Sequence, residues 1–333
     1  METANYSSTI ISRTPLRLPL GGGGTDLPSY YKEYGGFFVS AAINKYMNIV
    51  IHPRIVKGLR LAYSKTEIVN NADEVEHPII REALRKTAIK YGLEILSFAD
   101  VPASTGLGSS GSFAVGLLRG LHSVKHEFVG PADIAEEACD ISMNILKEPS
   151  GKQDEYVASF GGIRAYKIGK NGKVEIEELK LPQSTIADLE SNIMLFYTGL
   201  TRESREVLSK QQKNIRSGSS VEQMHKIKEI GMDSKKALEK GDLTRFGELL
   251  HEHWLAKRSV TDNMTNDFID KAVETARNNG AIGEKILGAG GGGFLMVYAD
   301  ENHKKIRSAM EAIGMPEHRV RFDFEGSKVI YNI

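Results

Sequence analysis

The chain has 333 residues, of which 41% are hydrophobic and 26% charged, a composition typical of globular proteins. Its 43 basic and 43 acidic side chains balance, so nothing indicates a nucleic-acid or anionic-membrane surface, which needs clustered positive charge. The single cysteine, Cys139, excludes an intrachain disulfide and a cysteine-based metal cage. Met1–Thr14 lacks a signal-peptide pattern, and no apolar run approaches the ~20 residues of a membrane span. We therefore expect a cytoplasmic protein without membrane or nucleic-acid partners.

The first half of the chain is expected to mix strands and helices. Ile80, Leu84 and Ala88 share one helical face, and Pro131 suits the first turn of a later helix. The expected elements are the strands Thr9–Leu20, Gly36–His52 and Ile95–Val101, and the helices His77–Tyr91, Ser112–Val124 and Pro131–Leu146, with a loop over Ala103–Gly111.

The second half opens with a predicted hairpin, because Asn171-Gly172 is a strong type I′ turn signal. A polar stretch from Pro182 to Ser191 then separates two strands and suggests a domain boundary. The expected elements are the strands Ile163–Ile168, Lys173–Leu181, Ile193–Tyr197, Phe294–Tyr298, Arg319–Phe324 and Lys328–Tyr331, and the helices Asp267–Asn279, His303–Ile313 and most of Arg202–Arg258, broken at Ser217–Ser220. Strands and helices do not alternate strictly, so the fold class is α+β.

The sharpest motif is VPASTGLGSSGSF, residues 101–113, between a predicted strand and a predicted helix. Its glycines let backbone N–H groups approach a ligand closely, and a helix start attracts phosphate. Ser109 and Ser110 add hydroxyls that suit phosphate or magnesium. A tight turn with a serine cap would show the same pattern.

The chain contains two further glycine-rich segments, one near its start and one near its end. PLRLPLGGGGTD, residues 15–26, combines Arg17 and Asp26 with flexible backbone, which suits a polar substrate. KILGAGGGGF, residues 285–294, leads into a strand and implies that something packs against bare backbone. Each segment alone could be an ordinary loop, but three in one chain favour a ligand site.

Other nucleotide folds fit less well. Gly106, Gly108 and Gly111 match G-x-G-x-x-G, yet the stretch before Glu127 is a poor strand for a dinucleotide fold. The chain contains no G-x-x-x-x-G-K-[ST] motif and no H-R-D or D-F-G set, which removes the common P-loop and the protein kinases.

Taken together, the three segments resemble the motifs of the GHMP kinases, a family of small-molecule kinases. The family pattern P-x-R-x-x-x-x-G-x-x-T-D is met from Pro15 to Asp26, P-x-x-x-G-L-G-S-S from Pro102 to Ser110, and G-A-G-x-G-G from Gly288 to Gly293. The G-G-G-T-D form and the run from Gly151 to Gly162 look most like kinases of D-glycero-D-manno-heptose 7-phosphate.

The resemblance implies a two-lobed α+β fold. The N-terminal lobe, residues 1–187, would be like ribosomal protein S5 domain 2, with a left-handed β-α-β crossover that departs from the usual hand. The C-terminal lobe, residues 188–333, would be ferredoxin-like, with the active site between the lobes. The protein would act as a monomer or homodimer.

The resemblance also implies a role for each motif residue. Asp154, in the Q-D-x-Y segment, would accept the proton of the sugar hydroxyl, and Arg17 would pair with it. ATP phosphates would lie against the second motif, with Ser110 as a magnesium ligand. The implied nucleotide-binding residues are Pro102, Thr105, Gly106, Leu107, Gly108, Ser109, Ser110 and Gly111, and the implied substrate-binding residues are Gly23, Gly24, Thr25, Asp26, Lys152, Gly290 and Gly291.

One position departs from the pattern. Relatives carry a glutamate twelve residues before the aspartate as a second magnesium ligand, and Ser142 stands there in this chain. Asp140, Glu136, Glu137 or water would have to take over, and Asp140 is the first candidate. Lys152, Arg202 and Arg205 are candidates for holding a substrate phosphate.

We therefore expect an ATP- and Mg²⁺-dependent kinase that phosphorylates the anomeric hydroxyl of a sugar or sugar phosphate. The alternatives are a galactose- or fucose-type acceptor, mevalonate or homoserine on the same fold, and a nucleotide-binding homologue with weakened chemistry, which Ser142 would favour.

Overall fold

The computed structural model describes residues 8–200, 204–261 and 264–333. Its strands are β1 (Ile10–Gly21), β2 (Gly36–Pro53), β3 (Leu59–Ala62), β4 (Thr66–Val69), β5 (Leu93–Ala99), β6 (Ile163–Ile168), β7 (Val174–Glu178), β8 (Ile193–Tyr197), β9 (Gly283–Ile286), β10 (Phe294–Tyr298) and β11 (Lys328–Asn332). Its helices are α1 (Pro28–Tyr34), α2 (Pro78–Lys86), α3 (Ser109–Val124), α4 (Pro131–Cys139), α5 (Gln153–Phe160), α6 (Gln183–Asn192), α7 (Ser204–Arg216), α8 (Val221–Lys240), α9 (Leu243–Arg258), α10 (Asp267–Asn278) and α11 (His303–Ala312), with a 3₁₀ turn at Ala72–Glu74 and a π-helix at Asp140–Ile145.

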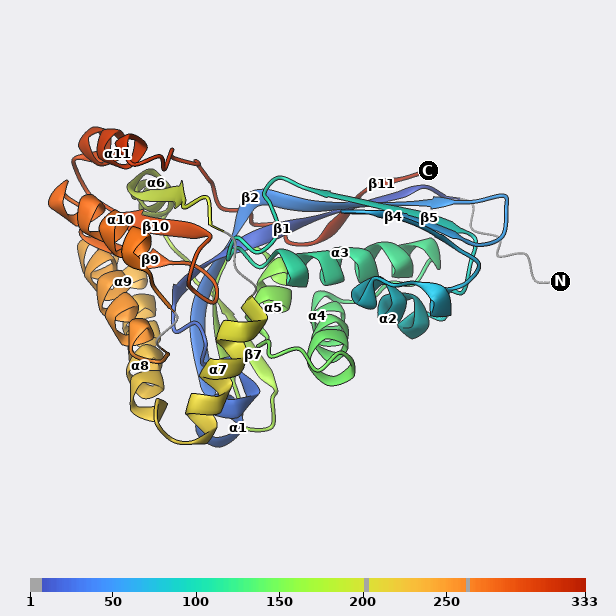
Figure 1. The fold of residues 1–333 in the computed structure, drawn as a ribbon, viewed down its shortest axis with the longest axis horizontal. Helices are drawn as coiled ribbons and strands as arrows, with labels where there is room; N and C mark the ends of the chain where they lie inside the picture. The colour runs from blue at the N-terminus through green and yellow to red at the C-terminus, as the bar shows by residue number, and fades with distance from the viewer. Residues whose placement is uncertain (1–7, 201–203, 262–263) are drawn as a thin grey trace.

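A large sheet forms the longer part of the molecule (Figure 1). Its strands run in the order β11-β1-β2-β5-β3-β4, and β6 and β7 continue from β2. The 18-residue strand β2 is shared, since its first part pairs with β6 and its second part with β5. β3 and β5 are parallel, whereas the other pairs in this sheet are antiparallel.

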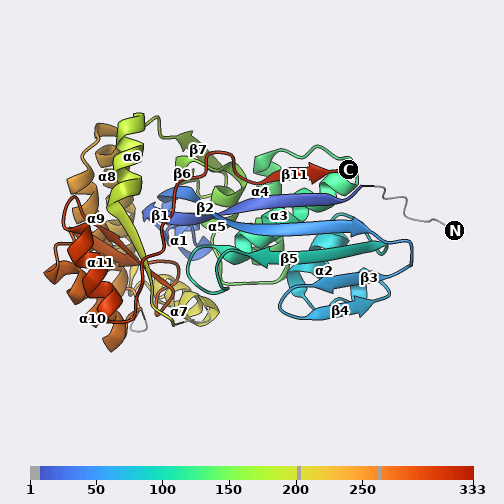
Figure 2. The same cartoon turned by 90° about the horizontal axis from the view of Figure 1, so that it is seen from above.

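Helix α3 lies along one face of this sheet, beside α2, α4 and α5 (Figures 1 and 2). Two glycines allow the close approach: a Cβ at Gly116 would lie 2.7 Å from Thr14 Oγ1, and one at Gly120 would lie 2.7 Å from Ile51 Cδ1. Ser12 Oγ donates to the Gly116 carbonyl at 2.7 Å. These contacts set the height of α3 above β1 and thereby place the start of the helix at the centre of the molecule.

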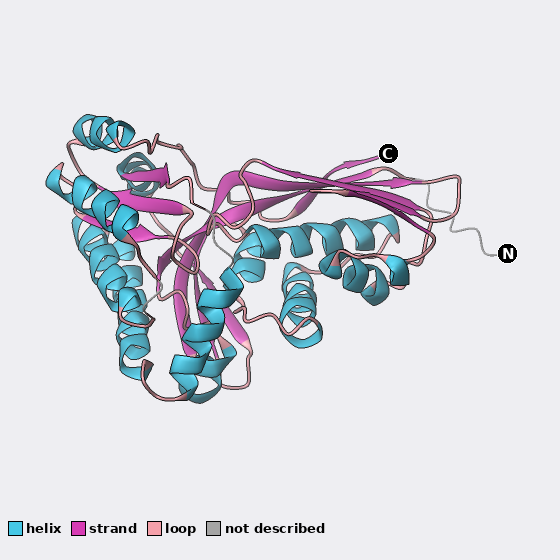
Figure 3. Ribbon diagram, viewed as in Figure 1, coloured by secondary structure: helices cyan, strands magenta, loops and turns pink. Residues whose placement is uncertain are grey.

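A second sheet, β8-β10-β9, forms the core of the other end (Figure 3), where α9, α10 and α11 pack against it, whereas α8 packs on β1 and β2 (Figure 1). All its pairs are antiparallel, and Glu317 adds one isolated bridge to Phe196. The last strand, β11, returns to pair with β1 in the large sheet. A division at residue 187 would fall inside α6 and separate β11 from its sheet, so the two-lobe boundary remains a prediction.

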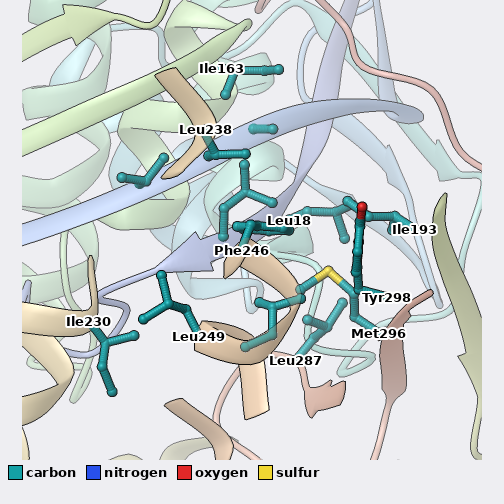
Figure 4. Packing of buried hydrophobic residues seen from close by; sticks show 14 of the residues in the cluster. Leu18, Ile163, Ile193, Ile230, Leu238, Phe246, Leu249, Leu287, Met296 and Tyr298 are labelled. Carbon is teal, nitrogen blue, oxygen red and sulfur yellow. The ribbon is translucent and has the colours of Figure 1, made fainter. Parts of the chain in front are cut away.

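One apolar cluster joins the two ends (Figure 4). Leu18 of β1 belongs to the same cluster as Leu238 of α8, Phe246 of α9 and Met296 of β10, and all four are fully buried. Burying such side chains is worth about 1.5–3 kcal/mol each. This shared core fixes the relative positions of two glycine-rich segments. The first lies at the end of β1 and the third lies before β10.

Several sequence expectations need correction. The helix expected over Pro131–Leu146 changes to a π-helix at Asp140, and the polar stretch after Pro182, for which no helix was expected, forms α6. Helix α3 begins at Ser109, three residues before the expected Ser112. Within the residues described, Arg319–Phe324 makes a single bridge, Ile43 to Phe322, instead of a strand. No helix of the described chain has the length and hydropathy to cross a membrane.

Candidate active site

The three glycine-rich segments meet around a cavity of about 360 Å³, within the usual size range of small-molecule sites. Its wall includes Arg17 and Gly23 from the first segment, Gly108 from the second and Gly290 from the third. Arg17 and Gly290, 273 positions apart in the chain, therefore border the same cavity.

The second segment forms a loop that ends at the N-terminus of α3. Gly106 and Gly108 have φ values of +81° and +78°, a conformation that favours glycine. Gly108 is the N-cap and has no side chain to satisfy the first-turn N–H groups, and a helix N-terminus with free N–H groups attracts anions. Ser109, Ser110 and Gly111 line the cavity beside this cap.

Three of the predicted nucleotide-binding residues stabilise this loop through hydrogen bonds and do not line the cavity. Thr105 is buried, its hydroxyl donates to the Pro102 carbonyl at 3.1 Å, and its own carbonyl accepts from Phe294 N. Leu107 is buried and its carbonyl accepts from Arg17 N at 3.0 Å. Pro102, Thr105 and Leu107 are absent from the described cavity wall.

The third segment packs directly on the second. A Cβ at Gly106 would lie 2.5 Å from the Leu287 carbonyl oxygen, and one at Gly288 would lie 2.5 Å from Gly106 Cα. Gly290 lines the cavity, whereas Gly291 donates its N–H to the Met264 carbonyl and does not reach the described wall. The glycines that fit the two loops together are therefore Gly106 and Gly288, and of the predicted pair only Gly290 borders the cavity.

Arg17 and Asp154 form an ion pair at the entrance of α3. Arg17 Nε donates to Asp154 Oδ1 at 2.8 Å and Nη2 lies 2.7 Å from the same oxygen. Arg17 Nη1 also donates to the Gly106 carbonyl at 2.5 Å. The Asp154 side chain is 34% exposed and lines the cavity, while the Arg17 side chain is 6% exposed. The carboxylate is thus held by a buried cation and faces the cavity beside the loop at Gly106–Ser110.

Glycine at position 111 makes room for Asp154. A Cβ there would lie 2.6 Å from Asp154 Cβ, although alanine is favoured over glycine in a helix by about 1 kcal/mol. We expect Gly111→Ala to keep the helix and to lower kcat about 10²-fold, because a displacement of ~1 Å costs that much. Circular dichroism and steady-state kinetics check this, and an unchanged kcat would show that α5 tolerates displacement from α3.

Asp26 is buried and holds the loop before α5. Its Oδ1 accepts from Gly24 N and its Oδ2 from Gln153 N, both at 3.0 Å. Burial raises the pKa of Asp26, and the backbone N–H of Gln153 opposes that rise. Gly23, Gly24 and Asp26 line the cavity. Asp26 therefore positions the residue next to Asp154 and borders the place where a substrate would lie.

Three other predicted residues point away from the cavity. The Thr25 hydroxyl is buried and donates to backbone carbonyls of Gly22 and Phe37. Lys152 donates to Glu136 and to the Gly172 carbonyl. Asp140 pairs with Lys86 at 2.8 Å. None of these three is in the described wall, and each has a structural partner instead. Arg205 borders the cavity, and Arg202 lies outside the described residues.

Sequence reasoning missed Glu155, the residue after Asp154. It is 3% exposed and lines the cavity, Ser142 Oγ donates to its Oε1 at 3.0 Å, and its Oε2 has no partner among the described residues. Burial, followed by the charge of Asp154, raises the pKa of Glu155 to about 8. The signal in the sequence was an acidic residue directly after the expected catalytic aspartate. Its contact with Ser142, which stands where relatives carry a glutamate, is visible only in the structure.

It also missed two lysines from the C-terminal part of the chain that line the cavity. Lys257 of α9 and Lys285 of β9 are 8% and 2% exposed, and both line the cavity. Lys257 Nζ donates to the carbonyls of Ile286 and Gly288, and Lys285 Nζ donates to the Pro19 carbonyl at 3.0 Å and lies 3.2 Å from His253 Nδ1. Lys285 is the first residue of the third glycine-rich segment, which could have indicated that it lies near the site. Lys257 lies one helical turn after His253, which also lines the cavity.

The buried Lys257 makes stability depend on pH. Burial, followed by the charge of Arg17, lowers its pKa from 10.5 to about 7. Between these values the unfolded state binds the extra proton, so we expect stability to rise with pH from about 7 to 10 by a few kcal/mol. Urea unfolding at pH 7 and 9.5 should show this rise in the wild type and a weaker one in Lys257→Met. If the free energy of unfolding changes with pH equally in the wild type and in Lys257→Met, Lys257 is not the source of the rise.

The site can now be compared with known proteins. Family models match the chain over residues 77–162, as the GHMP kinases N terminal domain, and over residues 234–314, as the GHMP kinases C terminal region. The chain is 28% identical over 315 residues to the D-glycero-alpha-D-manno-heptose 7-phosphate kinase of Campylobacter jejuni, covering 89% of this chain and 91% of that protein. It is 26% identical over 312 residues to the mevalonate kinase of Pyrococcus horikoshii, covering 88% of each.

A solved structure agrees with these matches. That of a D-glycero-D-manno-heptose 1-phosphate kinase from Bacteroides thetaiotaomicron has a TM-score of 0.80 at 26% identity, covering 96% of this chain and 98% of that one. The fold and the site define a small-molecule kinase that transfers phosphate from ATP to an alcohol group. The chain belongs to the GHMP kinase family. This confirms the predicted family and the two-lobed α+β fold.

Proposed function

We propose that the protein phosphorylates the anomeric hydroxyl of a sugar phosphate, with D-glycero-D-manno-heptose 7-phosphate as the best candidate. The observation that carries the proposal is the Arg17–Asp154 pair at the N-terminus of α3, inside a cavity of substrate size. Similarity to the Campylobacter jejuni heptose 7-phosphate kinase over 89% of the chain supports this acceptor.

Each part of the site has a task in this reaction. Phosphoryl transfer needs positioning and charge stabilisation more than covalent chemistry by the protein. The loop at Gly106–Ser110 would hold the ATP phosphates against backbone N–H groups. Asp154 would accept the proton of the sugar hydroxyl as its oxygen bonds to the terminal phosphorus and the bond from phosphorus to ADP breaks. Arg17 would keep that carboxylate aimed.

The residues present also fit a magnesium ion. Ser110 is exposed in the cavity wall, and the buried Glu155 has an oxygen without a described partner. Carboxylate and hydroxyl oxygens are the ligands that Mg²⁺ prefers, and it often takes one or two carboxylates from a protein. We propose that Ser110 and Glu155 hold the metal, Glu155 replacing the glutamate absent at Ser142. When bound, the ion would neutralise charge on the phosphates.

Incubation with Mg-ATP and a panel of acceptors tests the function. The panel contains heptose 7-phosphate, heptose, galactose, fucose and mevalonate, and ADP release and ³¹P NMR identify the product. We expect turnover of the heptose phosphate with an acid-labile anomeric phosphate as product. Turnover of mevalonate alone, or ADP release equal to that of Asp154→Asn for every acceptor, would refute the proposal.

A further inference from the structure

Two buried lysines in the cavity have no anionic partner among the described residues. Lys257 and Lys285 are at least nine-tenths buried, and in the described part of the chain their hydrogen bonds go to carbonyl oxygens and to the His253 ring. Neither forms an ion pair with a described carboxylate, whereas Arg17 has Asp154. Lysine is almost never fully buried unless it is paired, and an uncompensated buried charge is costly.

Both lysines come from the C-terminal part of the chain and face the first two motifs. Lys285 bonds to the carbonyl of Pro19, two residues after Arg17. Lys257 bonds to the carbonyl of Gly288, the residue that packs on Gly106 of the phosphate loop. Burial lowers the pKa of both lysines, Lys257 lowers that of Lys285 further, and the charge of Arg17 adds to both shifts. Two lysine amino groups therefore line the cavity near the Arg17–Asp154 pair, where an anion would favour their protonated form.

We infer that Lys257 and Lys285 form an anion subsite that receives a phosphate group bound in the cavity. The inference rests on the proposed function, because a sugar-phosphate acceptor and ATP both bring phosphate to this wall. Lysine binds phosphate as a compact point charge with three donors. A phosphate would supply the missing negative charge, either as the group carried by the acceptor or as the terminal group of ATP.

Lys257 is the residue to change, because Lys285 also ties β9 to β1 through Pro19. Lys257→Met keeps the length of the side chain, and replacing a buried charge by an apolar group is often neutral or stabilising. Lys257→Arg keeps the charge. Lys236→Met is the matched control, since Lys236 is exposed on α8 and pairs with Asp233 away from the cavity.

Calorimetric titration with inorganic phosphate tests the subsite without any turnover. We expect Lys257→Met to weaken phosphate binding at least 10-fold, Lys257→Arg to retain most of it, and Lys236→Met to leave it unchanged. Equal phosphate affinity in the wild type and Lys257→Met would overturn the inference. Phosphate binding that depends on Lys257 in a protein that phosphorylates no sugar would support the subsite while the proposed function fails.

Kinetics and nucleotide binding then distinguish the two sources of phosphate. If the subsite holds the phosphate of the acceptor, Lys257→Met raises the KM for heptose 7-phosphate and leaves the KM for unphosphorylated heptose unchanged. If it holds the terminal phosphate of ATP, affinity for ATP falls while affinity for ADP is retained. Changes in none of these constants would also overturn the inference.

Discussion

Asp154→Asn is expected to lower kcat about 10²- to 10⁴-fold, the usual contribution of a general base. Asparagine has the same shape but cannot accept the proton of the acceptor hydroxyl. Binding of ATP should change little, because the phosphate loop and the N-terminus of α3 remain in place. Single-turnover rates give the loss in chemistry, and calorimetry gives the affinity for ATP.

The control for this variant is Asp233→Asn, which removes an exposed carboxylate that pairs with Lys236 on α8. It should retain the wild-type rate. A kcat of Asp154→Asn within about 3-fold of the wild type would show that Asp154 does not carry proton transfer, since general-base help is worth at least about 10²-fold.

Glu155→Gln is expected to weaken the effect of magnesium on nucleotide binding. In the wild type, Mg²⁺ should strengthen the binding of a non-hydrolysable ATP analogue, measured by calorimetry with and without the metal. We expect that gain to fall by about 10- to 100-fold, a loss typical even of residues that only support a metal ligand. The variant should fold well, because glutamine removes a carboxyl whose burial raises its pKa to about 8.

A second substitution makes this prediction specific. Ser142 Oγ lies 3.0 Å from Glu155 Oε1, so a carboxylate brought in from position 142 would reach the same part of the cavity. Adding Ser142→Glu to Glu155→Gln should restore much of the magnesium effect. Glu175→Gln, an exposed change on β7, is the control. If the magnesium effect survives in Glu155→Gln alone, the metal ligand lies elsewhere.

The sequence predicted most of the fold that depends on local pattern. Strands β1, β2, β8 and β10 and helices α10 and α11 follow from apolar periodicity and from caps such as Gly280. The helical stretch expected up to Arg258 has a second break, at Gly241, which divides α8 from α9. It failed where tertiary contacts override local preference. The stretch after Pro182 is polar but becomes a helix because Ile186 and Leu189 pack into the shared core. The π-helix after Cys139 places Ser142 against Glu155, and no residue pattern indicates it.

The three glycine motifs could be identified from the sequence, because phosphate binding demands particular residue types at fixed spacing. The roles of Arg17 and Asp154 were implied by the resemblance to the GHMP kinases. The order of those motifs was enough to indicate the family. Only the tertiary structure decided which candidates reach the cavity: Lys152, Thr25 and Asp140 have structural partners, while Glu155, Lys257 and Lys285 line the wall. The reason is physical, since burial and the distance between charges depend on how strands and helices far apart in the chain pack, and sequence spacing does not encode that distance.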